Sequence, residues 1–193
     1  MIEFIERELN KLATLIADIQ ADKALLAQVV QSVDIIVDTL RKGGKVLIAG
    51  NGGSAADAQH IAGEFVSRFH YDRPGLAAIA LTTDTSILTA IGNDYGYEKL
   101  FARQVQALGR EGDVFIGIST SGNSANVVEA LKVAADLKLK TIGFTGANEG
   151  KMVHMCDIAL RMPSKETPKI QEGHIAIGHI ICGLVEVAMF PRN

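Results

Sequence analysis

The fold is decided by the stretch Lys45-Val46-Leu47-Ile48-Ala49-Gly50-Asn51-Gly52-Gly53-Ser54. Its first half is a short, continuous apolar run, which is typical of a strand buried on both faces of a parallel sheet. Its second half is a glycine-rich loop that leads into a helical pattern over residues 55–69. A strand, a glycine-rich loop and a helix in this order predict the first unit of an α/β fold.

The same alternation continues to the end of the chain. Further strands are expected at 76–81, 113–118, 140–145 and 157–161, and helical stretches at 84–108, 125–138, 149–155 and 169–189. Within the helical stretch 84–108 we expect a loop at Gly92-Asn93-Asp94-Tyr95-Gly96. This order predicts a three-layer αβα sandwich with a doubly wound, five-stranded parallel sheet, in one domain spanning residues 1–193.

The first 41 residues differ from the rest because they carry two helical periods and no strand. Apolar residues recur at helical spacing over residues 2–41, and Gly43-Gly44 ends the pattern. The second helix is apolar on more than one face, which favours packing against another subunit over covering the sheet. We therefore predict that residues 1–41 form an N-terminal helical oligomerisation segment.

Composition narrows the class of protein. The 193 residues carry a net charge of −3 without a cluster of Lys and Arg, which argues against binding of nucleic acid or an anionic membrane. Two cysteines are too few for a disulfide scaffold. The chain has no continuous apolar run of membrane-spanning length, and its charged start does not resemble a signal peptide. We expect a cytoplasmic protein.

Two loops of similar chemistry follow two of the expected strands, namely residues 50–54 and Ser119-Thr120-Ser121-Gly122-Asn123-Ser124. Each offers glycine, small hydroxyls and the N–H groups of a helix N-terminus, a combination that suits a phosphate. The alternative is that Ser54 and Ser124 are only helix N-caps. A P-loop is excluded because neither loop contains G-K-[ST].

The first loop also matches the dinucleotide pattern G-x-G-x-x-A through Gly50, Gly52 and Ala55. A dinucleotide-dependent oxidoreductase is disfavoured, because no acidic residue stands at the end of the second strand to hold the ribose.

Acid, base and metal candidates lie on two helices. His60 and Glu64 are four residues apart and share one helix face, where they could bind a metal, exchange protons or form a solvated contact. On the last helix, Gln171 and His179 are rotated by about 80° from each other. His174 lies on the other side of Gln171, about 140° from His179. Spacing alone leaves both histidines open. The residues around His179 are apolar, and a lone histidine in such surroundings is more often a core residue than part of a site.

Three motifs taken together resemble the sugar isomerase (SIS) domain family. They are Gly50-Asn51-Gly52-Gly53-Ser54 with Asp57 and His60, then Ile118-Ser119-Thr120-Ser121-Gly122-Asn123-Ser124, and finally Ile170-Gln171-Glu172. The resemblance covers nearly the whole chain, including the helical N-terminus, and is greatest to the members that isomerise heptose phosphates.

The resemblance implies an aldose–ketose isomerase that interconverts sedoheptulose 7-phosphate and D-glycero-D-manno-heptose 7-phosphate, the first step toward the ADP-heptose of lipopolysaccharide core. It implies a homotetramer with sites near subunit interfaces, and one Zn²⁺ per subunit bound by His60, Glu64, Gln171 and His179. The implied substrate contacts are Asn51, Gly52, Gly53, Ser54, Glu64, Arg68, Asn93, Asp94, Ser119, Thr120, Ser121, Ser124 and Gln171.

The resemblance also assigns catalytic roles. Glu64 and His179 would be the acid–base pair that moves a proton between two sugar carbons through an enediol. Two alternatives remain: a non-catalytic SIS protein that binds a replication initiator, which Ala90-Ile91 and Phe190-Pro191 also resemble, and an isomerase of another sugar phosphate. A pure binding module has no need for His60, Glu64, Gln171 and His179 together, so we expect an enzyme.

Overall fold

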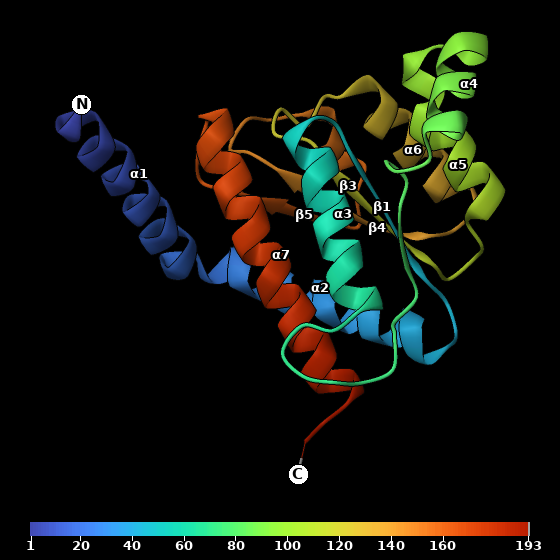
Figure 1. Cartoon of the computed structure of the whole chain (residues 1–193), viewed down its shortest axis with the longest axis horizontal. Coiled ribbons are helices and arrows are strands. Elements are labelled where there is room, and N and C mark those ends of the chain that lie inside the picture. The colour runs from blue at the N-terminus through green and yellow to red at the C-terminus, as the bar shows by residue number, and fades with distance from the viewer. Residues whose placement is uncertain (193) are drawn as a thin grey trace.

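The computed structural model describes residues 1–192, and Asn193, the last residue of the predicted domain, lies outside the described residues. The elements, labelled in Figure 1, are α1 (Ile2–Ala21), α2 (Lys23–Arg41), β1 (Val46–Gly50), α3 (Gly53–Val66), β2 (Ala78–Ala80), α4 (Thr85–Tyr95), η1 (Tyr97–Lys99), α5 (Leu100–Leu108), β3 (Val114–Ile118), α6 (Ala125–Asp136), β4 (Lys140–Thr145), η2 (Lys151–His154), β5 (Ile158–Arg161) and α7 (Thr167–Met189).

All five strands are parallel, and they lie in the order β2-β1-β3-β4-β5. The chain therefore winds outward in both directions from β1 and β3, which confirms the predicted doubly wound α/β fold. Gly50 at the end of β1 pairs with Ile118 at the end of β3. The two loops that follow these strands consequently leave the sheet at one edge, at the topological switch point where such folds bind ligands.

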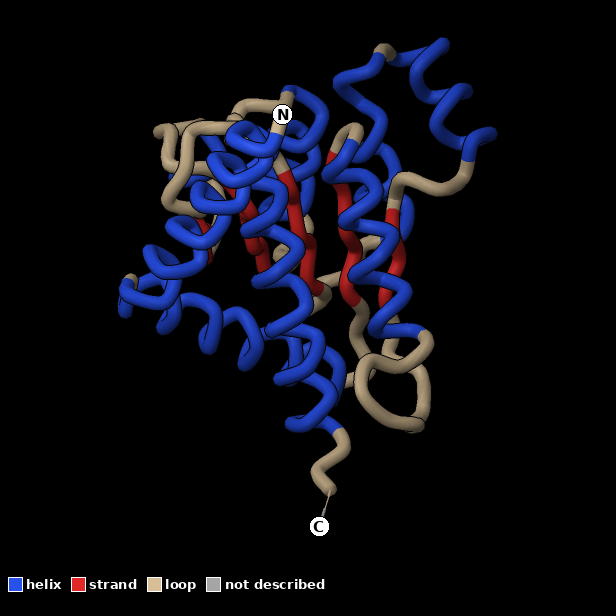
Figure 2. The backbone as a smooth tube through the Cα atoms, turned by 60° about the vertical axis from the view of Figure 1, so that its left-hand side comes forward, coloured by secondary structure: helices blue, strands red, loops and turns tan. Residues whose placement is uncertain are grey.

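Helices cover both faces of the sheet (Figure 2). Side chains alternate along β1: Val46 and Ile48 pack into a core shared with α2, α3 and α7, whereas Leu47 packs into a second core shared with α5 and α6. Strands buried on both faces need apolar residues at every position, which explains the continuous apolar runs in the sequence. The three-layer sandwich is as predicted.

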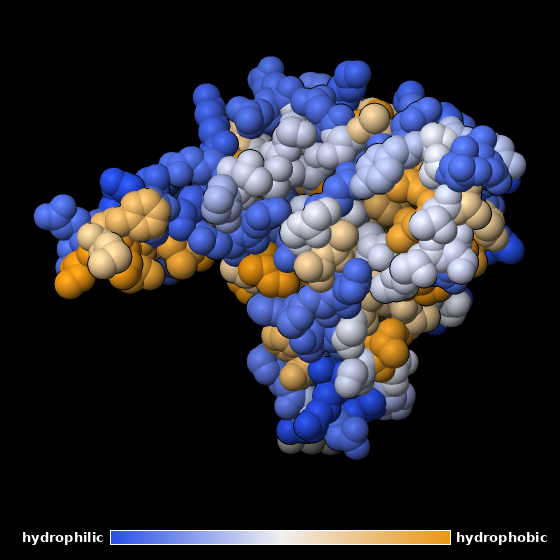
Figure 3. Space-filling view, turned by 45° about the horizontal axis from the view of Figure 1, so that its top comes forward, coloured by the Kyte–Doolittle hydropathy of each residue, from blue (hydrophilic) through white to orange (hydrophobic). Residues whose placement is uncertain are grey.

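The two N-terminal helices behave differently. Asp22 separates them, because its side chain accepts hydrogen bonds from the N–H groups of Ala24 and Leu25 and caps α2. Helix α2 packs against α7 and the sheet and buries Val29, Val33, Ile36 and Val37, whereas Val30 stays exposed. Helix α1 instead projects from the domain (Figure 1) and exposes apolar side chains along one side (Figure 3), including Phe4 and Leu9.

The loop predicted at residues 92–96 is wrong except at Gly96. Helix α4 continues through Gly92 to Tyr95, and the chain breaks only at Gly96, where φ is +89° and glycine is favoured. A single glycine inside a helix lowers its stability without ending it, so Gly92 was a weak sign of a loop. Helix α4 begins at the N-cap Asp84, whose carboxylate accepts the N–H of Ile87.

Helix α7 is long and apolar enough to cross a membrane by length and composition alone. In the structure, however, it lies along α2 and α3 and buries Ile177, Ile181 and Val185 in the core. It also buries the carboxylate Glu186. One side of α7 is thus packed inside the domain, whereas Ile180, Leu184 and Val187 are exposed on the helix.

Candidate active site

Helices α3 and α7 lie side by side and run in the same direction. Gly53 faces Gln171 at one end of the pair, and Ile61 faces Gly178 near the middle. A Cβ atom at Gly178 would come within 2.8 Å of Ile61 Cδ1, so this glycine permits the close approach of the two helices. This approach brings two histidines together: His60, which precedes Ile61 on α3, and His179, which follows Gly178 on α7.

Three polar side chains from this helix pair form a compact cluster. The Nε2 atoms of His60 and His179 are 2.8 Å apart, and His60 Nε2 lies 3.3 Å from Glu64 Oε1. One donor atom from each of the three residues lies within 4.8 Å of the others. Two imidazoles and a carboxylate are ligands that zinc commonly takes in proteins, so these residues fit a metal ion.

Gln171, the fourth predicted ligand, lies nearer the glycine-rich loop. A Cβ atom at Gly53 would come within 2.5 Å of Gln171 Nε2, so the side-chain amide rests against the first residue of α3. His60 is about two helical turns further along α3. Gln171 therefore lies at the glycine-rich loop, and His60 lies further along the helix pair.

His174 is the core histidine that spacing could not identify. It is fully buried, its ring meets Phe144 edge-on, and its Nε2 atom lies 3.1 Å from the carbonyl oxygen of Thr145. A carbonyl only accepts, so Nε2 donates. Burial lowers the pKa of His174 to about 4, although the hydrogen bond to Thr145 opposes the shift. His179, and not His174, belongs to the cluster.

A pair of amides joins the two loops at the switch point. Asn51 and Asn126 each donate to the other's side-chain oxygen at 2.8 Å, and the Tyr97 hydroxyl donates to Asn51 Oδ1 at 3.0 Å. Asn51 was predicted as a substrate contact, whereas Asn126 and Tyr97 were missed. Their partners lie far away in the sequence, so no local pattern indicated them. The pair braces the glycine-rich loop against the start of α6.

The serines of the second loop do not cap their helix. Ser124 occupies the N-cap position of α6 without a side-chain cap, and its Oγ lies 2.8 Å from Ser119 Oγ. The N-cap of α3 is Gly52, and Ser54 lies inside that helix. The alternative that Ser54 and Ser124 are only N-caps is therefore wrong. Without a side-chain cap, the first-turn N–H groups of α6 can meet an anion.

The remaining predicted residues are more scattered. Arg68 is exposed just after α3, and Ser54 is buried. Asn93 and Asp94 are exposed in the last turn of α4, with Asn93 donating to Asp94 at 2.8 Å, and α4 packs on η1 and α5. Between α4 and the glycine-rich loop lies a cavity of about 460 Å³, lined by residues that include Asn51, Gly52, Thr89 and Gly92. Asn93 and Asp94 neither line this cavity nor belong to the cluster of His60, Glu64 and His179.

Comparison with known proteins shows which family the chain resembles. A family model described as SIS domain matches residues 6–146. The phosphoheptose isomerase of Burkholderia pseudomallei (strain K96243) is 61% identical over 194 residues, covering 97% of this chain and 98% of that protein. The phosphoheptose isomerase of Aneurinibacillus thermoaerophilus is 58% identical over 193 residues, covering 100% and 97%.

A solved structure supports the same relationship. Phosphoheptose isomerase GmhA from Neisseria gonorrhoeae superposes with a TM-score of 0.86 at 47% sequence identity, over 95% of this chain and 98% of that one. Fold and sequence agree with these relatives over nearly the full length of the chain. The chain belongs to the phosphoheptose isomerase family of SIS-domain proteins.

Proposed function

We propose that this protein is an isomerase that interconverts sedoheptulose 7-phosphate and D-glycero-D-manno-heptose 7-phosphate, at the entry to the ADP-heptose of lipopolysaccharide core. Membership of the phosphoheptose isomerase family supports this substrate. The observation that carries the chemistry is the meeting of Glu64 and His179, from two different helices, in one cluster. A carboxylate and an imidazole are the usual groups for moving a proton to and from carbon.

The reaction moves a proton between C1 and C2 of the sugar through an enediol. Starting from the aldose, Glu64 takes the proton from C2, and His179 serves the opposite direction or the sugar oxygens. Glu64 is partly shielded from water, with its side chain 23% exposed. The Phe69 ring lies 5.6 Å from that of His179 and shields one side of the imidazole. Partial exclusion of water strengthens the electrostatic interactions of both groups with a bound sugar.

The sugar phosphate binds at the loop Ser119–Ser124 and the start of α6. The loop contains no lysine, so hydroxyl groups and helix N-terminal N–H groups carry the recognition of the anion. Ser121 is exposed, and Ser119 and Ser124 lie within hydrogen-bond distance of each other. The sugar chain then extends past Asn51, Gly52 and Gly53 toward Glu64, with Ser54, Arg68, Asn93, Asp94, Thr120 and Gln171 as the further predicted contacts.

One Zn²⁺ per subunit is part of this proposal. His60, Glu64 and His179 supply donors that fit the ion, and Gln171 is the predicted fourth ligand. A bound zinc ion would polarise the sugar carbonyl. The protein's own contribution is to hold two imidazoles and a carboxylate together on the facing sides of α3 and α7.

We also propose a cytoplasmic homotetramer in which residues 1–41 contribute the subunit contacts and the chain forms one SIS domain. Support comes from α1, which projects from the domain and exposes Ile2, Phe4, Ile5 and Leu9. Exposed apolar side chains at this density are typical of surfaces covered by another protein. Native mass spectrometry tests the assembly, and Leu9→Glu should shift it toward smaller species.

The proposed activity is tested by a turnover assay with sedoheptulose 7-phosphate on metal-stripped protein, with and without added zinc. We expect turnover that zinc restores. Pentose and hexose phosphates in the same assay test the alternative of another sugar-phosphate substrate. Absence of turnover with every sugar phosphate would instead support a non-catalytic SIS protein such as a replication-initiator partner.

A further inference from the structure

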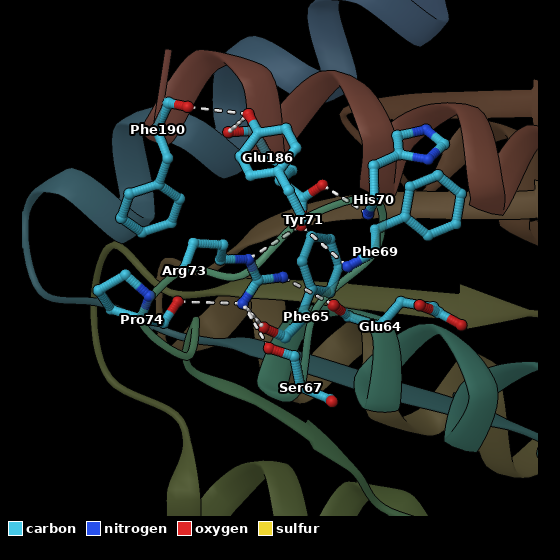
Figure 4. Close-up of polar contacts among 10 residues, drawn as sticks. All are labelled: Glu64, Phe65, Ser67, Phe69, His70, Tyr71, Arg73, Pro74, Glu186 and Phe190. Atoms are coloured by element: carbon cyan, nitrogen blue, oxygen red, sulfur yellow. Dashed lines mark hydrogen bonds and ion pairs between the residues drawn. The ribbon is translucent and has the colours of Figure 1, made fainter. Parts of the chain in front are cut away.

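A buried ion pair outside the reacting cluster joins the same two helices. Arg73, in the loop after α3, places its Nε 3.1 Å from Glu186 Oε1 of α7, and the two side chains are 2% and 0% exposed (Figure 4). Breaking a buried pair is costly, but the pair itself often adds little net stability compared with apolar residues. The stability of the protein alone therefore does not explain why Arg73 and Glu186 are buried as a charged pair.

Glu186 holds the loop that follows α3. Its carboxylate oxygens accept the backbone N–H groups of Phe69 at 2.8 Å and His70 at 2.7 Å. Burial raises the pKa of Glu186, but these two hydrogen bonds and Arg73 outweigh it, so the group stays charged. The fixed Phe69 in turn places its ring 5.6 Å from that of His179. Through its hydrogen bond to the Phe69 backbone, Glu186 therefore helps to hold the Phe69 ring beside the His179 imidazole.

Arg73 holds the end of α3 itself. Its Nη2 donates to the carbonyl oxygen of Glu64 at 2.8 Å, and its Nη1 donates to the carbonyl oxygens of Phe65 at 2.6 Å and Ser67 at 3.2 Å. Helix α3 ends at Val66, so Glu64 lies in the last turn, where carbonyl groups lack partners within the helix. A guanidinium here satisfies these carbonyls and interacts favourably with the helix dipole.

We propose that Arg73 and Glu186 are positioning residues that fix the last turn of α3, and with it Glu64, relative to His179 on α7. Arg73 donates a hydrogen bond to the backbone carbonyl of Glu64. Glu186 lies on α7 two turns beyond His179, and its ion pair with Arg73 connects the two helices. This inference rests on the proposed function for its kinetic readout. Its structural readouts, amide exchange and binding of Zn²⁺ alone, do not depend on the substrate.

The test uses the double variant Arg73→Met with Glu186→Gln in the full-length protein. It removes both charges together, so no unpaired buried charge remains, and Gln keeps one acceptor for the loop. We expect kcat to fall about 10- to 100-fold, as for other residues that orient a ligand or base through a hydrogen bond, with KM changed by less than about threefold. Zn²⁺ affinity, measured by calorimetry, should fall by a similar factor.

Hydrogen exchange supplies the readout that locates the effect. In the double variant, amides in residues 64–71 should exchange faster, and those of the sheet should not. The matched control is Lys45→Met with Asp113→Asn. This pair also includes a buried carboxylate that accepts backbone N–H groups, but it joins the residues just before β1 and β3, and its hydrogen bonds reach neither α3 nor α7. The control should lose stability and keep kcat, Zn²⁺ affinity and exchange in residues 64–71.

Several results would overturn the positioning role. One is a wild-type kcat in the double variant, and another is a lower kcat with unchanged exchange in residues 64–71. If the double variant fails to fold, Arg73→Lys replaces it: Lys keeps the charge but not the fork that reaches four backbone carbonyls, so kcat should still fall. A wild-type protein that does not act on sedoheptulose 7-phosphate refutes the proposed function instead, while exchange and Zn²⁺ binding still decide the positioning role.

Discussion

His60 Nε2 and His179 Nε2 lie 2.8 Å apart although 119 residues separate them in the sequence. Neither side chain can be placed by its own helix, because the contact depends on α3 and α7 packing in parallel through Gly178. At this distance one ring donates to the other, or the two share a cation. Glu64, one turn along α3 from His60, completes a site that exists only in the folded protein.

Replacing the acid–base pair should abolish most turnover without unfolding the protein. Glu64→Gln keeps the size of the side chain and removes the base, and His179→Ala removes the imidazole from a partly exposed position. Loss of a positioned acid or base commonly lowers the rate about 10²- to 10⁴-fold, and we expect this for each variant. Steady-state kinetics measure the loss of turnover, and circular dichroism checks that each variant is folded. His154→Ala, an exposed histidine on η2, is the control and should behave as wild type. Near-normal turnover in either site variant would refute the assignment.

Removing His60 should separate metal binding from folding. The side chain is 49% exposed, so His60→Ala should cost little stability. It should bind Zn²⁺ at least about tenfold more weakly, because one of the donors is lost. Equilibrium dialysis after treatment with a chelator measures the bound metal per subunit. Equal affinity in wild type and variant would show that this cluster is not the metal site.

The loop Ser119–Ser124 should contribute to binding of the substrate phosphate. Ser124→Ala removes a hydroxyl that lies 2.8 Å from Ser119 Oγ, and Ser121→Ala removes an exposed one. A hydrogen bond to a charged group contributes about 1.5–3 kcal/mol, so KM should rise about tenfold or more in each variant. Inorganic phosphate should also inhibit these variants less than wild type. An effect on kcat alone would show that the loop contacts another part of the substrate.

The architecture follows from local patterns, whereas the completed site does not. The apolar run before Gly50 predicts a doubly covered strand, and the order of elements predicts the sheet. Helix spacing, by contrast, cannot distinguish His174 from His179. His174 is a core residue because it packs against Phe144 and Thr145 of β4, and these contacts form only in the folded protein. The Asn51–Asn126 and Arg73–Glu186 pairs join segments 75 and 113 residues apart, so no sequence window contains both partners. A single carboxylate among apolar residues, Glu186, was the available signal for the buried ion pair.

Protein stability should depend on pH through His174. Its folded-state pKa is about 4, against an ordinary value of 6.5, because the ring is buried. As pH falls from 6.5 to 4, the unfolded chain takes up a proton that the folded chain does not. The free energy of unfolding therefore decreases over this range, by up to about 3 kcal/mol from this group, and the contribution is constant above and below it. Urea unfolding of wild type and His174→Gln measures the difference. Identical pH dependence in both proteins would contradict the assignment.

The approach of Gln171 to the glycine-rich loop makes Gly53 a sensitive position. A Cβ atom at Gly53 would come within 2.5 Å of Gln171 Nε2, the flexible end of a side chain, so Gly53→Ala should fold and displace the amide. The matched control is Gly63→Ala on the same helix, where an added Cβ meets nothing within 4 Å. Gly63→Ala places a better helix former inside α3 and should raise stability by up to about 1 kcal/mol, whereas Gly53→Ala, at the first residue of the helix and against Gln171, should fold without this gain.

Activity should separate the two alanine variants. Displacement of a positioning group by about 1 Å can cost about 10²-fold in rate, so kcat/KM should fall by at least about tenfold in Gly53→Ala and stay at the wild-type value in Gly63→Ala. Thermal unfolding and steady-state kinetics on the two proteins provide the comparison. Equal kcat/KM in both would mean that the Gln171 amide does not contribute to the reaction, and a wild-type Zn²⁺ affinity with reduced kcat/KM in Gly53→Ala would assign Gln171 to the substrate rather than to the metal.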